Sequence, residues 1–214
     1  MRLLSALVLS LLASTQVTAD DAALIRELAP AINPSAVSEA VSAMKCAQKN
    51  GVGEAASRLA IIDYTIPSRN QRLWVLDLKN RKLLFEEHVA HGKGSGEDIP
   101  NMFSNRNGSH QTSLGLFLTD ETYEGGNGYS LRLQCLSRGF NESAMERLIV
   151  MHGAPYVNPV AAAKMGRLGR SWGCPAVRTA VAQPIIDTLK LGQFIYAYGP
   201  GTASLSTCKT ENLS

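Results

Sequence analysis

The sequence predicts a mainly β domain that also contains helices, built as a mixed β-sandwich with a helical arm at its N-terminus. β-Branched and apolar runs dominate the middle of the chain, without the regular strand–helix alternation of a doubly wound sheet. Of the 214 residues, 45% are hydrophobic and 18% are charged, which suits a packed core and argues against disorder. The net charge of +3 does not indicate a nucleic-acid-binding protein.

The first part of the chain, residues 1–19, has the composition of a secretory signal peptide. Arg2 gives a positive start, residues 3–13 form an apolar run, and residues 17–19 are small or apolar residues before a cleavage point. The run is shorter than the roughly 20 apolar residues that cross a bilayer. The residue directly after the cleavage point is not a cysteine, so a lipid could not be attached there. We therefore expect an exported protein of the periplasm or cell envelope, without a stable membrane anchor.

The mature chain divides into a helical arm over residues 20–57, a main domain over 58–200 and a tail over 201–214. The second helix of the arm begins at Asn33 and Pro34, a cap residue and a proline at the first helical position, and ends at Gly51. Its residues Val37, Val41 and Met44 have helical spacing and form an apolar stripe. Strands are expected at 59–66, 72–78, 82–91, 114–119, 129–136, 148–152 and 194–198, and later helices at 159–164 and 181–189.

The chain contains four cysteines, and their surroundings differ. Export would permit disulfides, and four thiols allow three full pairings. Cys135 lies in an alternating strand with Leu131 and Leu133, as a thiol packed in a core would. Cys174 instead lies between a glycine and a proline, which leaves its sulfur accessible and lets backbone N–H groups point at a bound carbonyl.

The sequence has no phosphate-binding or zinc-binding motif with the residue spacing that such a site requires. The glycine-rich run 92–96 matches neither dinucleotide-binding nor P-loop spacing, so we interpret it as a turn. A zinc peptidase could use His88, His91, His110 and His152, but His88 and His91 would point to opposite faces of a strand. We expect neither a metal nor another cofactor.

The charges around Cys174 are one-sided. Between Glu146 and Asp187 the chain has no carboxylate. The same stretch holds five cations: Arg147, Lys164, Arg167, Arg170 and Arg178. Such a field favours a thiolate, and arginine can hold a substrate carboxylate with two parallel hydrogen bonds. A basic, solvated face would give the same pattern.

His152-Gly153 and Ser171-Trp172-Gly173-Cys174 resemble the signature of YkuD-type L,D-transpeptidases, in particular the exported murein L,D-transpeptidase catalytic-domain proteins. The similarity continues through residues 61–64, 72–75, 89–92 and 113–117 to Phe194, and so covers most of the mature chain. The resemblance implies that 58–200 is a catalytic domain with a β-sandwich-like fold, in which cysteine and histidine face each other across a groove.

The resemblance also implies a reaction on peptidoglycan stem peptides. The thiolate would attack the carbonyl at the L-centre of the third stem residue, expel the terminal D-alanine and form a thioester. An amine of a neighbouring stem would then resolve the thioester into a cross-link. Resolution by water would make the protein an L,D-carboxypeptidase.

Residue roles follow from the same resemblance. Cys174 would be the nucleophile and His152 the base, with the N–H groups of Gly173 and Cys174 as oxyanion donors. Ser171 would orient His152 or shape the loop. Substrate-binding roles are assigned to Arg170, Arg167, Trp172, Gly153 and Tyr156.

Two positions depart from the motif: Trp172 replaces the usual histidine, and Ala176 replaces the usual arginine or asparagine. The third catalytic partner is therefore open. These departures also leave open a non-catalytic murein-binding envelope module.

The remaining cysteines can then be paired. Cys46 in the arm and Cys208 in the tail would tie both ends of the chain down, leaving Cys135 as a core thiol, although a Cys135 pairing with either stays open. We expect a monomer whose partners are stem peptides, with no nucleic acid bound.

Overall fold

The computed structural model describes residues 12–206, with side chains from residue 20 onward. Two helices open the chain, α1 (Leu12–Leu28) and α2 (Pro34–Lys49). Helix α1 runs across the expected cleavage point after residue 19, whereas residues 1–11 of the expected signal peptide lie outside the described part. No helix within residues 12–206 is long and apolar enough to cross a membrane.

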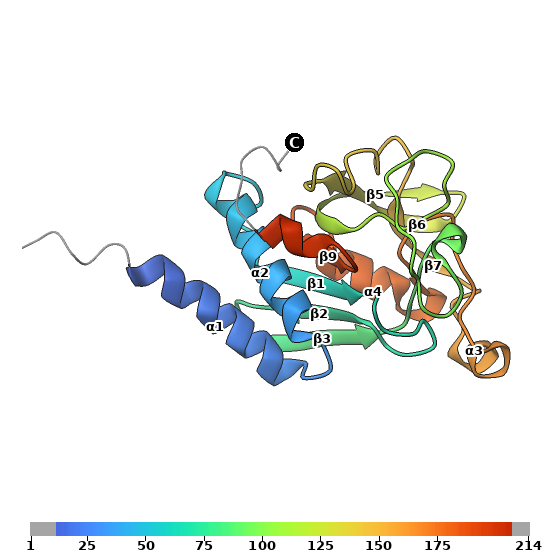
Figure 1. The fold of residues 1–214 in the computed structure, drawn as a ribbon, viewed down its shortest axis with the longest axis horizontal. Helices are drawn as coiled ribbons and strands as arrows, with labels where there is room; N and C mark the ends of the chain where they lie inside the picture. Colours follow the sequence, from blue (N-terminus) through green and yellow to red (C-terminus); the bar gives the residue numbers. More distant parts are fainter. Residues whose placement is uncertain (1–11, 207–214) are drawn as a thin grey trace, which may run out of the picture.

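One mixed nine-stranded sheet forms the body of the molecule (Figure 1). Its strands are, in chain order, β1 (Arg58–Asp63), β2 (Leu73–Asp77), β3 (Lys82–Glu87), β4 (Val89–Ala90), β5 (Gly115–Gly125), β6 (Gly128–Cys135), β7 (Val150–Ala154), β8 (Ala176–Arg178) and β9 (Phe194–Tyr198). In space the order is β3-β2-β1-β9-β5-β6-β7-β8-β4. The β1–β9 and β7–β8 pairs are parallel and the other pairs are antiparallel.

The sheet curls back on itself. Strands β3 and β4 stand at opposite ends of the strand order, yet only His88 separates them in the chain. The two edges of the sheet must therefore approach each other, which gives the sandwich-like arrangement and confirms the fold class predicted from the sequence. The expected strand 82–91 is in fact two strands, because the chain changes pairing partner at His88, from β2 to β8.

Helices pack on both faces of the sheet. Residues Leu59 and Ile61 of β1 pack in a cluster with α2, whereas Ala60 and Ile62 pack in a second cluster with α4 (Thr179–Leu189). Because successive strand residues point to opposite faces, β1 is buried on both sides. Figure 1 shows α1 and α2 along the β1–β2–β3 side and α3 (Pro159–Met165) at the opposite end of the molecule.

Helix α2 forms where the sequence predicts it. The side chain of Asn33 accepts a hydrogen bond from the Ser35 N–H at 2.9 Å, and Pro34 occupies the first turn. The predicted stripe of Val37, Val41 and Met44 is buried against the sheet. Two 3-10 turns, Lys93–Ser95 and Thr202–Ser206, complete the described elements.

The cysteines divide between bonded and free. Cys46 is disulfide-bonded, whereas Cys135 and Cys174 carry free thiols. The alternatives in which Cys135 forms a disulfide are therefore wrong. Cys208 lies outside the described residues, so the Cys46–Cys208 pairing stays a prediction.

Candidate active site

The sheet places His152 on strand β7 and Cys174 in the loop just before the neighbouring strand β8. His152 in β7 is the parallel register partner of Ala176 in β8. Cys174 lies two residues before Ala176, and thus beside Val150, which lies two residues before His152. Neighbouring strands are about 4.8 Å apart, and the N–H of Val150 at the start of β7 acts on the Cys174 thiol. Cys174 therefore lies close to the first residue of the strand that carries His152, and it packs against the core cluster that contains Ile149 and Met151.

His152 has the hydrogen-bonding arrangement of a general base. Its Nδ1 faces the backbone oxygen of Gly153 at 3.0 Å. A carbonyl can only accept, so Nδ1 carries the proton and Nε2 has a lone pair available. Burial lowers the pKa of His152, which keeps the ring neutral at neutral pH. No hydrogen bond joins His152 to Cys174 among the described residues, so proton transfer requires the two side chains to come within hydrogen-bond distance.

The Cys174 thiol is free and half-buried. Its Sγ lies 3.6 Å from the backbone oxygen of Leu148. Burial raises the pKa of Cys174, while the N–H of Val150 and the charge of Arg147 act in the opposite direction. Burial is the largest of these effects, so the pKa of Cys174 lies above its usual value in spite of the nearby cation. The thiol needs a base to remove its proton.

The predicted cationic field is mostly neutralised by distant segments of the chain. Glu97 pairs with the guanidinium groups of Arg167 and Arg170, at 2.6 and 2.8 Å. Glu87 pairs in the same way with Arg178. Residues 147–186 contain no carboxylate, but carboxylates from earlier in the chain pair with their arginines in the folded structure.

Arg147 is the cation that acts on Cys174. Its guanidinium donates to the backbone oxygens of Ser104 and Gln111, at 2.7 and 2.6 Å, and to two serine hydroxyls. No carboxylate pairs with it in the described part of the chain. Arg147 thus stabilises the loop before β5 and keeps its charge near the sulfur.

Ser171 shapes the loop of residues 171–175, which we call the nucleophile loop after the role predicted for Cys174. Its hydroxyl donates to the backbone oxygen of Cys174 at 2.7 Å and accepts from the Gly173 N–H at 3.0 Å. The structure therefore favours the loop-shaping role of Ser171 over the orientation of His152. The Gly173 N–H is already engaged, so it could serve as an oxyanion donor only after losing this bond. The Cys174 N–H has no such partner in the described structure.

Position 173 requires glycine both because its φ is positive and because a Cβ would clash with its neighbours. Its φ of +129° is rarely adopted by residues with a side chain. A Cβ there would lie 2.8 Å from Ile149 Cδ1 and 2.9 Å from the backbone oxygen of Gln111. The nucleophile loop is thus packed tightly against the segment that carries Arg147.

A buried network that the sequence analysis missed lies beneath this loop. The fully buried guanidinium of Arg72 donates to the backbone oxygens of Val89 and Ile66 and lies 5.1 Å from the ring centroid of Tyr64. It also donates to His91 Nδ1 at 2.8 Å. Burial, followed by the Arg72 charge, lowers the pKa of His91 to about 4. No local pattern distinguishes a buried arginine from one at a strand edge.

The network reaches the nucleophile loop through the main chain. The backbone oxygen of His91 accepts from the Ser171 N–H at 2.9 Å, and the Lys93 N–H donates to the backbone oxygen of Ser171 at 2.8 Å. A Cβ at Gly92 would lie 2.9 Å from the Cα of Gly173. The glycine-rich run 92–96, interpreted from sequence as an ordinary turn, is therefore a wall of the site whose glycine permits this close approach.

The other predicted substrate-binding residues have different surroundings. Trp172 is 70% exposed, and its ring stacks on His110 with a centroid separation of 5.0 Å. The pKa of Tyr156 is raised to about 12, first by burial and then by the nearby Cys174. A Cβ at Gly153 would lie 2.8 Å from that of Ala182, so Gly153 has a clear packing role against α4.

The described histidines do not form a zinc site. No group of three histidine, cysteine, aspartate or glutamate side chains in residues 20–206 is placed to hold a metal ion. Two of the ring nitrogens already have hydrogen-bond partners: His91 Nδ1 contacts the Arg72 guanidinium, and His88 Nε2 faces the backbone oxygen of Arg69.

Comparison with known proteins gives a family match. The family model described as "L,D-transpeptidase catalytic domain" (YkuD_2) matches residues 28–198. No curated protein sequence matches the chain.

Solved structures with similarity include an L,D-transpeptidase from Mycobacterium smegmatis, at 15% identity and a TM-score of 0.41, covering 67% of this chain and 59% of that one. L,D-transpeptidase 1 of Mycobacterium tuberculosis gives 14% identity and a TM-score of 0.38, covering 67% and 62%. The helical cell shape determining protein Pgp2 from Campylobacter jejuni gives 12% and 0.43, covering 71% and 53%. This chain thus spans roughly three-fifths of the length of these structures.

Proposed function

This chain belongs to the family of L,D-transpeptidase catalytic domains, and on that premise we propose that it is an exported cysteine peptidyltransferase acting on peptidoglycan stem peptides. The observation that carries the proposal is a free Cys174 thiol, half-buried in the loop that leads into β8 and close to the first residue of β7, the strand that carries the neutral imidazole of His152.

Acylation would begin with a proton transfer. His152 Nε2 removes the Cys174 proton as Sγ attacks the carbonyl at the L-centre of the third stem residue, and a C–S bond forms. The carbonyl oxygen becomes an oxyanion, for which the Cys174 N–H is the available donor. The imidazolium then returns its proton to the terminal D-alanine nitrogen as the C–N bond breaks. The thioester and free D-alanine remain.

Deacylation would reverse these steps with a new nucleophile. An amine of a neighbouring stem loses a proton to His152 and attacks the thioester carbon, so that an amide bond forms and the C–S bond breaks. The thiol then regains its proton. The backbone oxygen of Gly153 is the group that fixes the His152 tautomer, and this contact makes it the natural candidate for the third catalytic partner.

The substrate-facing roles are also proposals. Trp172 is an exposed ring beside the nucleophile loop, where it can cover a bound stem. Arg167 and Arg170 could bind a substrate carboxylate by exchange with the exposed Glu97. Export to the periplasm or cell envelope is supported by the composition of residues 1–19. We propose a monomer.

The test uses purified mature protein and disaccharide tetrapeptides, with intact-protein and product masses as readouts. We expect an acyl-enzyme with the native chain and with Cys135→Ala, the matched control, and none with Cys174→Ala. An adduct that persists in Cys174→Ala would contradict the proposal.

The products distinguish a transpeptidase, a carboxypeptidase and a non-catalytic binding module. Cross-linked dimers indicate transpeptidation, and tripeptides alone indicate L,D-carboxypeptidase activity. If the protein binds murein sacculi equally well after substitution of Cys174 or His152 and forms no product, it is a non-catalytic module.

A further inference from the structure

We propose that His91 is a positioning residue for Cys174: as a neutral ring protonated on Nε2 it holds the nucleophile loop in place, and a second proton on the ring releases the loop. The catalytic consequence of this inference rests on the proposed function, whereas the attachment of the loop does not. His91 follows β4 directly and is fully buried. Its ring and its backbone bind different segments of the chain.

Two contacts fix the protonation state of the His91 ring. The Arg72 guanidinium lies 2.8 Å from His91 Nδ1, and the backbone oxygen of Gly96 lies 3.3 Å from Nε2. A guanidinium can only donate and a carbonyl can only accept, so Nδ1 has the lone pair and Nε2 carries the proton. His152 has the opposite tautomer, because its Nδ1 faces a backbone oxygen. His152 is thus suited to accept a proton on Nε2, and His91 to keep one there.

Arg72 depends on the acceptor that His91 provides. Its side chain is fully buried, and it also donates to the backbone oxygens of Val89 and Ile66. No carboxylate in residues 20–206 forms an ion pair with it. A buried charge without an ion pair is costly unless its hydrogen-bonding groups are satisfied. A proton on His91 Nδ1 would set two donors against each other, so one of the two side chains would have to move.

Ser171 connects the backbone of His91 to that of Cys174. The Ser171 N–H donates to the backbone oxygen of His91 at 2.9 Å, and the Lys93 N–H donates to the backbone oxygen of Ser171 at 2.8 Å. The Ser171 hydroxyl donates in turn to the backbone oxygen of Cys174 at 2.7 Å. Because Ser171 is itself buried, a displacement of His91 moves the loop that carries the thiol.

The ring also shares an acceptor with Arg170, the residue just before the nucleophile loop. The backbone oxygen of Gly96 accepts from Arg170 Nη1 at 2.7 Å and also faces His91 Nε2. Burial has the largest effect on the pKa of His91 and lowers it. The charges of Arg72 and Arg170 also lower this pKa, while the backbone oxygens of Gly96 and Glu97 act in the opposite direction. A second proton on His91 would add a third positive charge beside two guanidinium groups.

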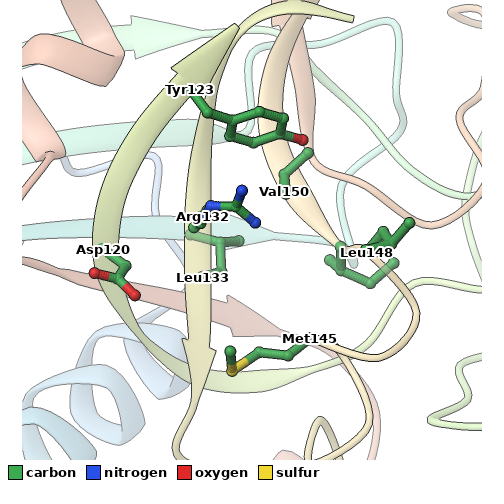
Figure 2. Close-up of a pocket in the computed structure, with 8 residues that line it drawn as sticks. Asp120, Tyr123, Arg132, Leu133, Met145, Leu148 and Val150 are labelled. Atoms are coloured by element: carbon green, nitrogen blue, oxygen red, sulfur yellow. The ribbon is translucent and has the colours of Figure 1, made fainter. Parts of the chain in front are cut away.

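The other support of the thiol comes from the residues at the start of β7 (Figure 2). The backbone oxygen of Leu148 lies 3.6 Å from Sγ, and the N–H of Val150 acts on the thiol. After release of the loop from His91, these groups alone would hold Cys174. Misplacement of a reacting atom by about 1 Å can cost on the order of 100-fold in rate. We therefore expect the loss of the His91 contacts to slow acylation more than it weakens substrate binding.

The first experiment follows the attachment in the native chain, without substrate. Nitrogen NMR of the His91 ring should show the Nε2-protonated tautomer at neutral pH. Hydrogen exchange at the Ser171 N–H, corrected for the intrinsic exchange rate, should lose about tenfold or more of its protection between about pH 7 and pH 4.5. The Gly166 N–H, which closes the local turn at the end of α3, is the control and should keep its protection. A ring protonated on Nδ1 at neutral pH, or pH-independent protection of Ser171, would overturn the proposal.

Matched variants separate the ring from its surroundings. His91→Asn keeps an acceptor for Arg72 but does not titrate, so it should lose most of the pH dependence of the Ser171 protection. His91→Leu removes the acceptor and should lower this protection already at neutral pH. His88→Leu is the control, because the His88 ring faces the backbone oxygen of Arg69 instead. Native pH dependence in His91→Asn, or native protection in His91→Leu, would contradict the proposal.

The last experiment measures the catalytic consequence with disaccharide tetrapeptides. At neutral pH, His91→Leu should form the acyl-enzyme about tenfold or more slowly than the native chain, and His91→Asn should restore most of the rate. Substrate affinity, measured for the same variants in the Cys174→Ala background, should change by about twofold or less. A loss confined to affinity, or a native acylation rate in His91→Leu, would refute the positioning role. If the native chain forms no acyl-enzyme at all, the proposed function fails, and hydrogen exchange still decides whether His91 holds the loop.

Discussion

Acid should destabilise this protein through His91 in particular. Arg72 donates to His91 Nδ1, so no proton can be added there without breaking a buried contact. The pKa of His91 is lowered from 6.5 to about 4, by burial and then by the Arg72 charge. Below about pH 6.5 the unfolded chain therefore binds a proton that the folded chain does not. The stability that comes from a neutral His91 is complete above pH 6.5 and is lost as the pH falls toward 4.

The size of the effect follows from these two pKa values. Between about pH 7 and pH 4.5, linkage predicts that the free energy of unfolding falls by about 2 kcal/mol through this one side chain. Since a domain is typically stable by about 5–15 kcal/mol, the loss is measurable by urea denaturation at the two pH values. Because Ser171 donates to the backbone oxygen of His91, the same loss should loosen the nucleophile loop.

The matched variant is His91→Asn, whose amide oxygen can accept from Arg72 but does not titrate. We expect its unfolding free energy to lose about 2 kcal/mol less than that of the native chain over the same pH range. His88→Asn is the comparison: burial also lowers the pKa of the half-buried His88, so this variant should flatten the slope as well, but less than His91→Asn does. An unchanged slope in His91→Asn, or a His91 ring that titrates near 6.5 by NMR, would refute the reasoning.

Three further variants test the site. Arg147→Gln should slow iodoacetamide alkylation of Cys174 near neutral pH, because a charge that lowers the thiol pKa is lost; an equal or faster rate would argue against that charge. The same variant should lose about 2–4 kcal/mol in urea denaturation, since two backbone oxygens lose their donors. Gly173→Ala should cost about 1–3 kcal/mol from its positive φ and displace the thiol, and a native urea midpoint would show that the loop relaxes freely. Trp172→Ala should leave thermal unfolding unchanged and weaken stem-peptide binding several-fold by NMR titration, whereas unaltered affinity would remove its substrate role.

Elements specified by local pattern were predictable. The cap at Asn33 and Pro34 and the stripe of Val37, Val41 and Met44 define α2, because capping and helical periodicity involve only neighbouring residues. The run 82–91 shows the limit of this reasoning. Its residues favour extended backbone throughout, but the break at His88 depends on which strand each half pairs with.

For the site, the sequence predicts Cys174 as nucleophile and His152 as base, and both roles stay predictions. A thiol between glycine and proline and a histidine near a strand end stand out locally. The electrostatics did not follow, because Glu87 and Glu97 reach Arg178 and Arg170 across long stretches of sequence.

The sequence by itself determined the mixed, strand-dominated class, the family resemblance and the choice of Cys174 and His152, since these depend on residue type and near-neighbour spacing. The tertiary structure decided which charges remain unpaired, which N–H groups are free and which side chains share a sheet face. The physical reason is that Coulomb interactions, burial and hydrogen bonds act through distance in space. Chain closure between β3 and β4 brings together residues whose separation in sequence carries no information about their contact.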